Sequence, residues 1–289
     1  MESASQHTEF SAATSDGLKL HGQAWMPPAP CGIIVVVHGL AEHSGRYHDF
    51  AQRANAVGFG VLTVDLRGHG QSPGEALWVN AFDDYLLDLD ALMLSVKRIS
   101  PDCPLFLMGH SLGGAIALRW VSMRAEQAAG LSGLVLSSAA LKVGSATPAA
   151  LVKLASLISR WLPRLRTQSP NANLISSLPA EVARYCEDPL VCLRAPPART
   201  GAEVLAVMPL NLAAAHKLTL PLYVFHGTAD TLTSPEGSVA LHTAWGGSDH
   251  SLRLWPGSMH ETLNDIDREG VMKELFAWLQ PRSLRKVCS

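Results

Sequence analysis

The sequence predicts an α/β protein built on a mostly parallel sheet. Strand-like and helix-like segments alternate along most of the 289 residues, as they do where parallel strands are joined by covering helices. Residues 33–39 (IIVVVHG) form a continuous, largely β-branched run, which is typical of a strand buried on both faces. Hydrophobic residues make up 47% of the chain, which is enough for one large core.

The first elements along the chain follow this alternation. Residues 22–26 close a short N-terminal strand or hairpin, before the buried run at 33–39. Residues 46–57 then place apolar side chains on one helical face, and Gly58 is a plausible helix stop. Residues 61–70 (VLTVDLRGHG) are the next strand with its exit loop.

The middle of the chain continues in the same way. Residues 82–99 carry a broad leucine-rich stripe at helical spacing, and Pro101 ends that helix. The apolar run at 105–108 predicts a buried strand, followed by a helix over about 112–125. Residues 134–138 (LVLSS) are a further strand.

The alternation lapses over residues 140–215, which hold few β-like runs and many Pro, Ala and Leu residues. It resumes with a strand at 222–230, a helix near 235–245, a strand at 252–257 and a helix over about 268–279. We therefore expect one core domain with an inserted helical cap. The predicted bounds are residues 1–139 and 216–289 for the core, and 140–215 for the cap.

Composition narrows the class of protein. Charged residues are 17% of the chain and the net charge is −2, with no basic stripe, so we expect no nucleic-acid partner. The five cysteines are odd in number and lack a C-x-x-C pair, which fits a reducing compartment. No signal-peptide core and no apolar run of about 18 residues is present. We expect a cytoplasmic protein of unassigned oligomeric state.

A serine between glycines is the first candidate catalytic residue. Gly109-His110-Ser111-Leu112-Gly113 matches G-x-S-x-G and lies between a predicted strand and a predicted helix, which is the context a nucleophile elbow requires. The glycines permit a tight strand–helix crossing where larger side chains would clash. Ser111 is therefore the predicted nucleophile.

A serine hydroxyl needs a base to take its proton. Of the twelve histidines, His260 follows the last predicted strand. We therefore expect it on a loop at the carboxyl edge of the sheet, close to the serine. His38 and His226 each end a strand before a glycine, and we assign them a role in tying loops. His260 is the predicted base.

The base in turn needs a buried carboxylate to orient it. Asp230 ends the strand before the last one, and the order Ser111, Asp230, His260 matches the order of this kind of triad. Asp65, at an earlier strand end, is a rival that we interpret instead as a loop anchor paired with Arg67.

Two backbone N–H groups should stabilise the oxyanion. Leu112 directly follows the nucleophile, and Leu40 follows Gly39 in the loop after the strand at 33–39. We predict these two amides as the oxyanion hole. No metal-ligand cluster or nucleotide motif is present, so no cofactor and no metal are expected.

Several motifs together resemble the α/β-hydrolase superfamily, and within it the branch of monoacylglycerol lipases, lysophospholipases and serine aminopeptidase-like proteins. They are, in chain order, VVHGLAEHSGRYHDFA, VLTVDLRGHGQSPG, LMGHSLGGAIAL, YCEDPLVCL, HGTAD and GSMHETLN. The resemblance runs from about residue 10 to 280. It implies an eight-stranded sheet, a helical cap, and the triad and oxyanion hole named above.

The resemblance also implies a site for a glycerol head group, which maps onto Glu42, Arg46 and Tyr185. The alternative for Glu42 and Arg46 is a local salt bridge that pins the oxyanion loop, and both roles can hold together. The pair Leu40-Ala41 is bulkier than the small or glycine-containing pairs common in this branch.

The expected function is hydrolysis of a small lipid ester, a monoacylglycerol or a similar single-chain ester, through an acyl-enzyme. The alternatives are a lysophospholipase, a broad carboxylesterase, and an aminopeptidase or amidase in which Glu42 holds the substrate amine. A non-catalytic binding protein would require a broken triad, and none of the three residues is missing.

The cap contains an apolar stripe whose role the sequence leaves open. Over residues 148–166 one helical face carries apolar side chains, and Arg164 and Arg166 lie at the far end. The stripe packs on the core, or it forms an acyl-tunnel wall or a surface that makes transient contact with a membrane or micelle. Its members are Leu151, Leu154, Leu157, Ile158, Trp161 and Leu162.

Overall fold

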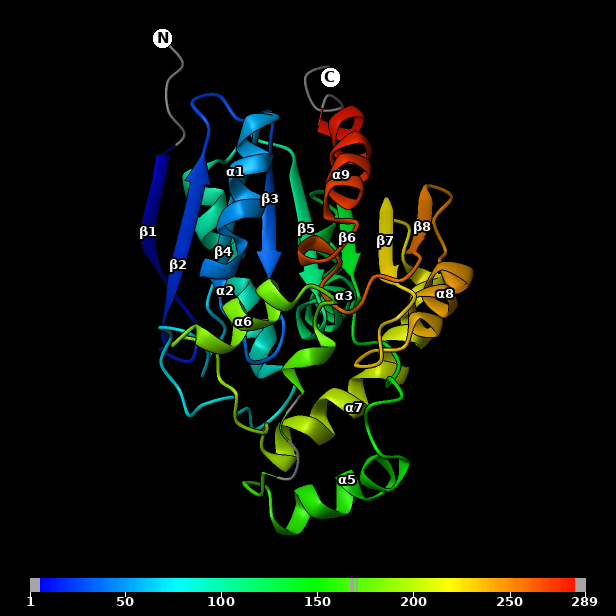
Figure 1. Ribbon diagram of the computed structural model, residues 1–289. Coiled ribbons are helices and arrows are strands. Elements are labelled where there is room, and N and C mark those ends of the chain that lie inside the picture. Colours follow the sequence, from blue (N-terminus) through cyan, green and yellow to red (C-terminus); the bar gives the residue numbers. More distant parts are fainter. Residues whose placement is uncertain (1–5, 167–168, 170, 284–289) are drawn as a thin grey trace.

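The computed structural model describes residues 6–166, 169 and 171–283 (Figure 1). Its centre is an eight-stranded sheet in the order β1-β2-β4-β3-β5-β6-β7-β8, which confirms the predicted α/β class and the implied number of strands. The strands are β1 (Gln6–Ala13), β2 (Lys19–Met26), β3 (Gly32–Val37), β4 (Phe59–Val64), β5 (Leu105–His110), β6 (Leu131–Ser137), β7 (Leu222–Gly227) and β8 (His250–Trp255).

Strands β3 to β8 pair in parallel, whereas β1 and β2 add an antiparallel hairpin at one edge. His7 lies in β1 and stacks on Trp25 with ring centroids 4.8 Å apart. Most β1 side chains are exposed, so backbone pairing holds this edge strand and its sequence lacks a strong apolar pattern.

Helices cover both faces of the sheet (Figure 1). The α-helices are α1 (His48–Ala56), α2 (Asp84–Ile99), α3 (Leu112–Met123), α4 (Ala125–Ala128), α5 (Ala149–Trp161), α6 (Pro179–Glu187), α7 (Ala198–Ala214), α8 (Pro235–Ala244) and α9 (Arg268–Ser283). Short 3-10 helices are η1 (Ser44–Tyr47), η2 (Ala172–Leu174), η3 (Ala215–Lys217) and η4 (Thr262–Asn264).

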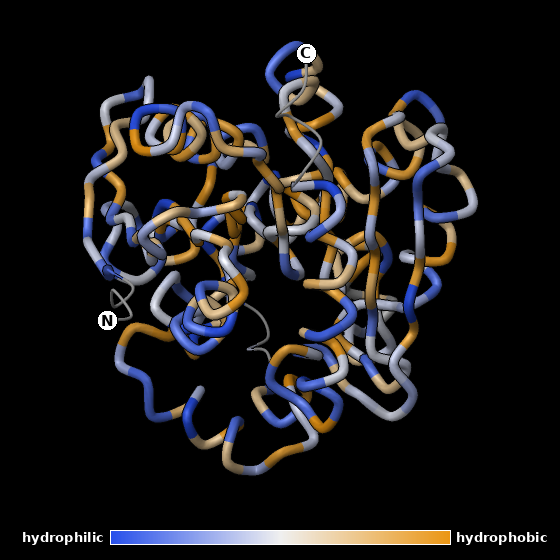
Figure 2. Tube along the Cα trace, turned by 90° about the horizontal axis from the view of Figure 1, so that it is seen from above, coloured by the Kyte–Doolittle hydropathy of each residue, from blue (hydrophilic) through white to orange (hydrophobic). Residues whose placement is uncertain are grey.

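The core divides between the two faces because side chains alternate along each strand. In β3, Ile33 and Val35 belong to the cluster formed with α2, α3 and α8, whereas Ile34 and Val36 pack with α1 and α9. Figure 2 shows apolar residues along the inner strands and polar residues along many outer turns. Both faces are covered, as a continuous β-branched strand requires.

The chain between β6 and β7 holds α5, α6 and α7, which lie beyond the carboxyl ends of the parallel strands (Figure 1). Within this segment α5 ends at Trp161, before Pro163, so the helical spacing predicted over 148–166 is interrupted there. No helix in the described ranges is both long and apolar enough to span a bilayer.

The apolar stripe of α5 divides between two surfaces. Ile158 lines an internal cavity, but Leu154, Leu157, Trp161 and Leu162 are exposed. Packing of the whole stripe against the core is therefore wrong, because these four apolar side chains are open to solvent. The Leu151 side chain lies outside the described residues.

Candidate active site

Ser111 lies at the sharp turn from β5 into α3, with φ 53° and ψ −117°. This left-handed conformation is costly for a non-glycine residue. Close packing fixes the turn: a Cβ on Gly113 would lie 2.0 Å from the Val37 carbonyl oxygen, and one on Gly109 would lie 2.3 Å from the Gly113 carbonyl oxygen. The elbow therefore depends on both glycines, for the reason that the sequence indicated.

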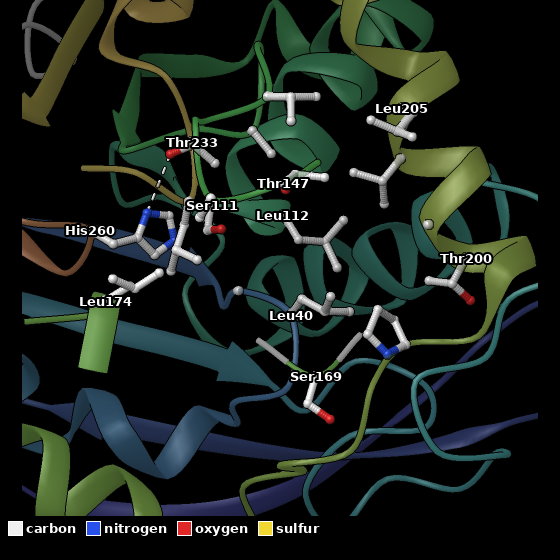
Figure 3. A pocket seen from close by; sticks show the side chains of 18 of the residues that line it. Leu40, Ser111, Leu112, Thr147, Ser169, Leu174, Thr200, Leu205, Thr233 and His260 are labelled. Atoms are coloured by element: carbon white, nitrogen blue, oxygen red, sulfur yellow. Dashed lines mark hydrogen bonds between the residues drawn. The ribbon is translucent and has the colours of Figure 1, made fainter. Parts of the chain in front are cut away.

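Asp230 and His260 meet at the carboxyl edge of the sheet. The His260 Nδ1–H group donates to Asp230 Oδ2 over 2.7 Å, and both residues are buried. Figure 3 shows His260 beside Ser111 in the same cavity, below Thr233. The structure thus brings together the three side chains that were predicted to act together.

The Asp230–His260 contact changes the ionisation of both groups. Burial opposes a charged Asp230, but His260 and His226 hold the pKa of the carboxyl well below its usual range. Burial likewise opposes a charged His260, but the Asp230 carboxylate raises the pKa of the imidazole above its ordinary value. Asp230 is therefore ionised at neutral pH and stabilises a proton on His260.

Asp65 is an anchor, as expected, but not through Arg67. Asp65 accepts hydrogen bonds from Ser44 N–H at 2.7 Å and from Gln71 N–H at 2.7 Å. Arg67 instead pairs with Asp88 and Asp16. The predicted Asp65–Arg67 pair is wrong, because the Arg67 side chain turns toward α2 and the loop before β2.

The two predicted oxyanion donors border the cavity. Leu112 is the first residue of α3, so its amide N–H has no intrahelical acceptor. Leu40 lies in the loop after β3, where the Gly39 N–H donates to Glu42 Oε1 over 2.6 Å. Leu40 and Leu112 both line the cavity near Ser111 (Figure 3).

A buried ion-pair network lies behind the oxyanion loop. Arg46 donates to Glu42 Oε2 over 2.8 Å and to both carboxylate oxygens of Glu261 over 2.7 Å. Its guanidinium also lies over the Tyr185 ring, 4.6 Å from the centroid. Burial opposes ionisation of Glu42, but Arg46 and nearby histidines lower its pKa to about 2.

This network bears on the three residues assigned to a head group. Glu42 and Tyr185 line the main cavity, whereas Arg46 lines a small cavity behind it. Because its guanidinium is held by Glu42 and Glu261, Arg46 forms the local salt bridge that the sequence offered as the alternative.

The main cavity has a volume of about 440 Å³ and is mostly apolar. The segment between β6 and β7 supplies apolar side chains to its wall, and polar groups gather near Ser111. Apolar wall residues from α5 and α7 include Val152, Ala155, Ile158, Val204, Leu205 and Met208. In the described part of the chain, no three His, Cys, Asp or Glu side chains are grouped to hold a metal ion.

The segment between β6 and β7 forms hydrogen bonds with the loops of the site. His43 Nε2 lies 2.8 Å from Asp188 Oδ2, and the Cys192 N–H donates to the Ala41 carbonyl over 2.9 Å. On the other side, the Glu261 N–H donates to the Ile175 carbonyl over 2.7 Å. This part of the segment is therefore joined by hydrogen bonds to the oxyanion loop and to the His260 loop.

Sequence reasoning missed Glu261 and Thr233 as members of the site. Glu261 directly follows His260, which was the one available signal, but its partner Arg46 is remote in sequence. Thr233 donates to Asp230 Oδ2 over 2.7 Å. Only the fold brings Arg46 and Glu261 together, whereas Thr233 lies three residues after Asp230 and could have been considered as a local turn contact.

Comparison with known proteins places the chain among serine hydrolases. Residues 28–267 match the family described as serine aminopeptidase, S33. The chain is 32% identical to the monoacylglycerol lipase of Mycolicibacterium smegmatis, over 95% of this chain and 98% of the relative. It is 30% identical to the monoglyceride lipase of Homo sapiens, over 93% of this chain and 89% of the relative.

A solved structure gives the same result. The crystal structure of Paleococcus ferrophilus monoacylglycerol lipase superposes with a TM-score of 0.79 at 30% identity. The match covers 97% of this chain and 100% of that one. The similarity extends over the segment between β6 and β7 as well as the sheet, since so little of either chain is left out.

Proposed function

The chain belongs to the serine aminopeptidase S33 family, and from that premise we propose that it hydrolyses monoacylglycerols with Ser111, Asp230 and His260 as catalytic residues. It is a carboxylic ester hydrolase of the monoacylglycerol lipase-like branch. The observation that carries the residue assignment is the 2.7 Å contact between Asp230 and His260, beside a serine held in a nucleophile elbow.

In the first step Ser111 Oγ attacks the ester carbonyl while His260 Nε2 takes the serine proton. Asp230 keeps Nδ1 of His260 protonated, so that Nε2 is free to accept. The N–H groups of Leu40 and Leu112 bind the oxyanion of the tetrahedral intermediate. His260 then protonates the departing glycerol oxygen, which leaves the acyl group on Ser111.

In the second step water attacks the acyl-enzyme, and His260 acts again as base and then as acid. The fatty acid leaves and Ser111 regains its proton from His260. The atoms balance without a redox partner: one water is consumed, and one glycerol and one fatty acid are released. These steps use only side chains and amides of this chain.

We propose that residues 140–215 form a cap that receives the acyl chain. The apolar wall contributed by α5 and α7 supports this, because a hydrocarbon chain gains free energy when its surface leaves water. Glu42 and Tyr185 stand at the polar end, where a glycerol head group would lie. A lysophospholipid or another single-chain ester would use the same wall.

We propose further that the outer face of α5 contacts the lipid aggregate that holds the substrate. Leu157 is 54% exposed and Trp161 is 72% exposed, with Arg160 exposed beside them. Such a surface suits an anionic lipid interface. Trp161→Ser should lower co-sedimentation with phosphatidylglycerol vesicles, whereas Ile266→Ser, at an exposed apolar residue far from α5 in sequence, should leave it unchanged.

The family's name raises a second candidate, the cleavage of an aminoacyl amide, in which Glu42 would hold the substrate amine. The contacts of Glu42 count against it, since Arg46, Tyr47 and the Gly39 N–H already occupy its oxygens. Rates on aminoacyl-naphthylamides and on a medium-chain monoacylglycerol separate the two reactions, and we expect turnover of the ester alone.

The nucleophile is tested by Ser111→Ala against Ser122→Ala, a control near the C-terminal end of α3. We expect Ser111→Ala to lose at least about 10³-fold in kcat on monoacylglycerol and to resist labelling by a fluorophosphonate. Ser122→Ala should match the parent protein. Full activity of Ser111→Ala would overturn the assignment, and a chain-length series against lysophospholipids would define the substrate class.

A further inference from the structure

A second imidazole contacts the carboxylate proposed to orient the base. His226 lies at the end of β7 and is completely buried. Its Nε2 atom is 2.9 Å from Asp230 Oδ2, the same oxygen that accepts from His260 Nδ1 at 2.7 Å. Two histidines therefore share one carboxylate oxygen, and the mechanism above uses only one of them.

The partners of His226 determine which ring nitrogen carries a proton. Nε2 faces a carboxylate that can only accept, so Nε2 must be protonated and donate. Nδ1 lies 2.8 Å from the hydroxyl of Ser238, a buried residue of α8 that can donate to it. The ring is thus held at both nitrogens, between α8 and the Asp230 loop.

The other contacts of Asp230 show why a fixed donor is useful. Oδ1 accepts from the backbone N–H groups of Leu232 at 2.8 Å and Thr233 at 3.0 Å. At Oδ2 the Thr233 hydroxyl donates over 2.7 Å, but it has another acceptor in the Ser138 carbonyl at 3.1 Å. His226 Nε2 lies 2.9 Å from Asp230 Oδ2 and 3.3 Å from the Thr233 hydroxyl oxygen, so the carboxylate is its nearer and more strongly accepting partner.

We propose that His226 is a positioning residue that holds Asp230 Oδ2 in line with His260. It also limits how much of the negative charge on Oδ2 acts on His260. The inference rests on the proposed function, since it assigns a role within that triad. A donor shared with His260 withdraws charge from Oδ2. It therefore keeps the imidazolium of His260 from becoming too stable to release its proton to the leaving group.

The groups around the two rings are few. Asp230 faces both rings, while Glu42, Glu261 and His110 act on His260. The partner of His226 on β8 is Leu254, and α8 contributes Ser238. Asp230 is thus the charged group in hydrogen-bond contact with both imidazoles.

Two amide substitutions separate the positioning role from simple packing. The Gln side-chain nitrogen reaches where Nε2 of a histidine lies, whereas the Asn nitrogen falls short of Asp230. We expect His226→Gln to keep kcat on a short-chain p-nitrophenyl ester within about threefold. His226→Asn and His226→Leu should lose between about 10- and 100-fold in kcat, with KM unchanged.

The pH profile gives a readout that a packing defect would not produce. Without the shared donor, Asp230 stabilises the imidazolium of His260 more strongly. The acid limb of kcat/KM should then move to higher pH by about half a unit in His226→Asn, and stay in place in His226→Gln. His242→Leu, a histidine of α8 without a contact to Asp230, is the control and should behave as the parent protein.

Parent-like activity of both His226→Asn and His226→Leu would overturn the inference, as would a His226→Gln variant no better than His226→Leu. If His226→Leu does not fold, the comparison of Asn with Gln decides the question. Failure of the proposed function is distinguishable, because it would appear as an inactive parent protein or an active Ser111→Ala variant.

Discussion

The catalytic floor and the helical cover of the cavity are built on different physical principles. The floor comprises residues 39–46, 109–113, 230–233 and 260–261, and the cover comprises α5 and α7. The floor holds its charged side chains through hydrogen bonds to partners, as with Arg46 between two carboxylates. The cover presents apolar side chains to the cavity, and α5 leaves others in solvent.

This difference indicates that the floor and the cover have separate functions, catalysis and substrate selection. Hydrogen bonds have strict geometry, so the floor can hold the reacting groups at fixed positions relative to one another. Apolar contacts are non-directional and adapt to shape, so the cover can accept a flexible hydrocarbon chain. We infer that changes in the floor alter the chemical step, and that changes in the cover alter which ester reaches Ser111.

The strongest test of the floor removes the charge of Asp230. Asp230→Asn should lower kcat by about 10⁴-fold, because the amide favours the wrong tautomer of His260. The measurement is steady-state turnover of a soluble ester. Asp102→Asn, at an exposed loop residue, should have no effect. If Asp230→Asn kept a tenth of the parent activity, the assigned role of the floor would fail.

The next test breaks the buried network behind the oxyanion loop. Glu261→Ala leaves Arg46 buried with Glu42 alone, and we expect a loss of about 3 kcal/mol in the free energy of unfolding. The matched control is Glu269→Ala, which breaks an exposed pair with Arg53 and should cost less than about 1 kcal/mol. Equal losses in urea denaturation would contradict the distinction.

The pH dependence follows from the raised pKa of His260. The base must be neutral to act, so kcat/KM should fall as pH drops through a value above the ordinary pKa of about 6.5. At pH 5 the rate should be at least roughly 30-fold below the plateau. A profile that is flat from about pH 5 to 8 would exclude His260 as the base.

The smallest expected effect concerns strain in the oxyanion loop. Ala41 has φ 71°, a left-handed conformation that costs alanine about 1 kcal/mol. Ala41→Gly removes this strain but adds freedom to the unfolded chain, so we expect a net stabilisation of about 0.5 kcal/mol. Ala206→Gly, on an exposed position of α7, should instead destabilise by about 1 kcal/mol. A destabilised Ala41→Gly would show that the strain is not released.

The sequence predicted the floor better than the cover. The elbow at Ser111 and the strand ends at Asp230 and His260 follow from local motifs and from the rule that parallel strands end at one edge. The fold class they imply is confirmed. The packing of α5 could not be predicted, because an apolar stripe looks the same whether it faces a core, a cavity or solvent.

Long-range polar contacts escaped prediction for a different reason. Arg46 and Glu261 are separated by most of the chain, and His43 and Asp188 by about half of it. Such pairs depend on how loops cross at the sheet edge. His226 lies only four residues before Asp230, but the sequence did not show that the turn between them places Oδ2 against the His226 ring. The sequence allowed an N-terminal hairpin closed by residues 22–26 but did not give the bounds of β1, because backbone hydrogen bonds, rather than a buried face, hold that strand.

The separation of function between the floor and the cover is tested most directly by the ratio of the turnover rates on two substrates. For the double variant Leu157→Ser/Trp161→Ser, turnover of vesicle-embedded monoacylglycerol is compared with turnover of a soluble short-chain ester. We predict that the vesicle rate falls at least about tenfold while the soluble rate stays within twofold, since the floor is untouched. Equal losses on both substrates, or no loss on vesicles, would contradict the account.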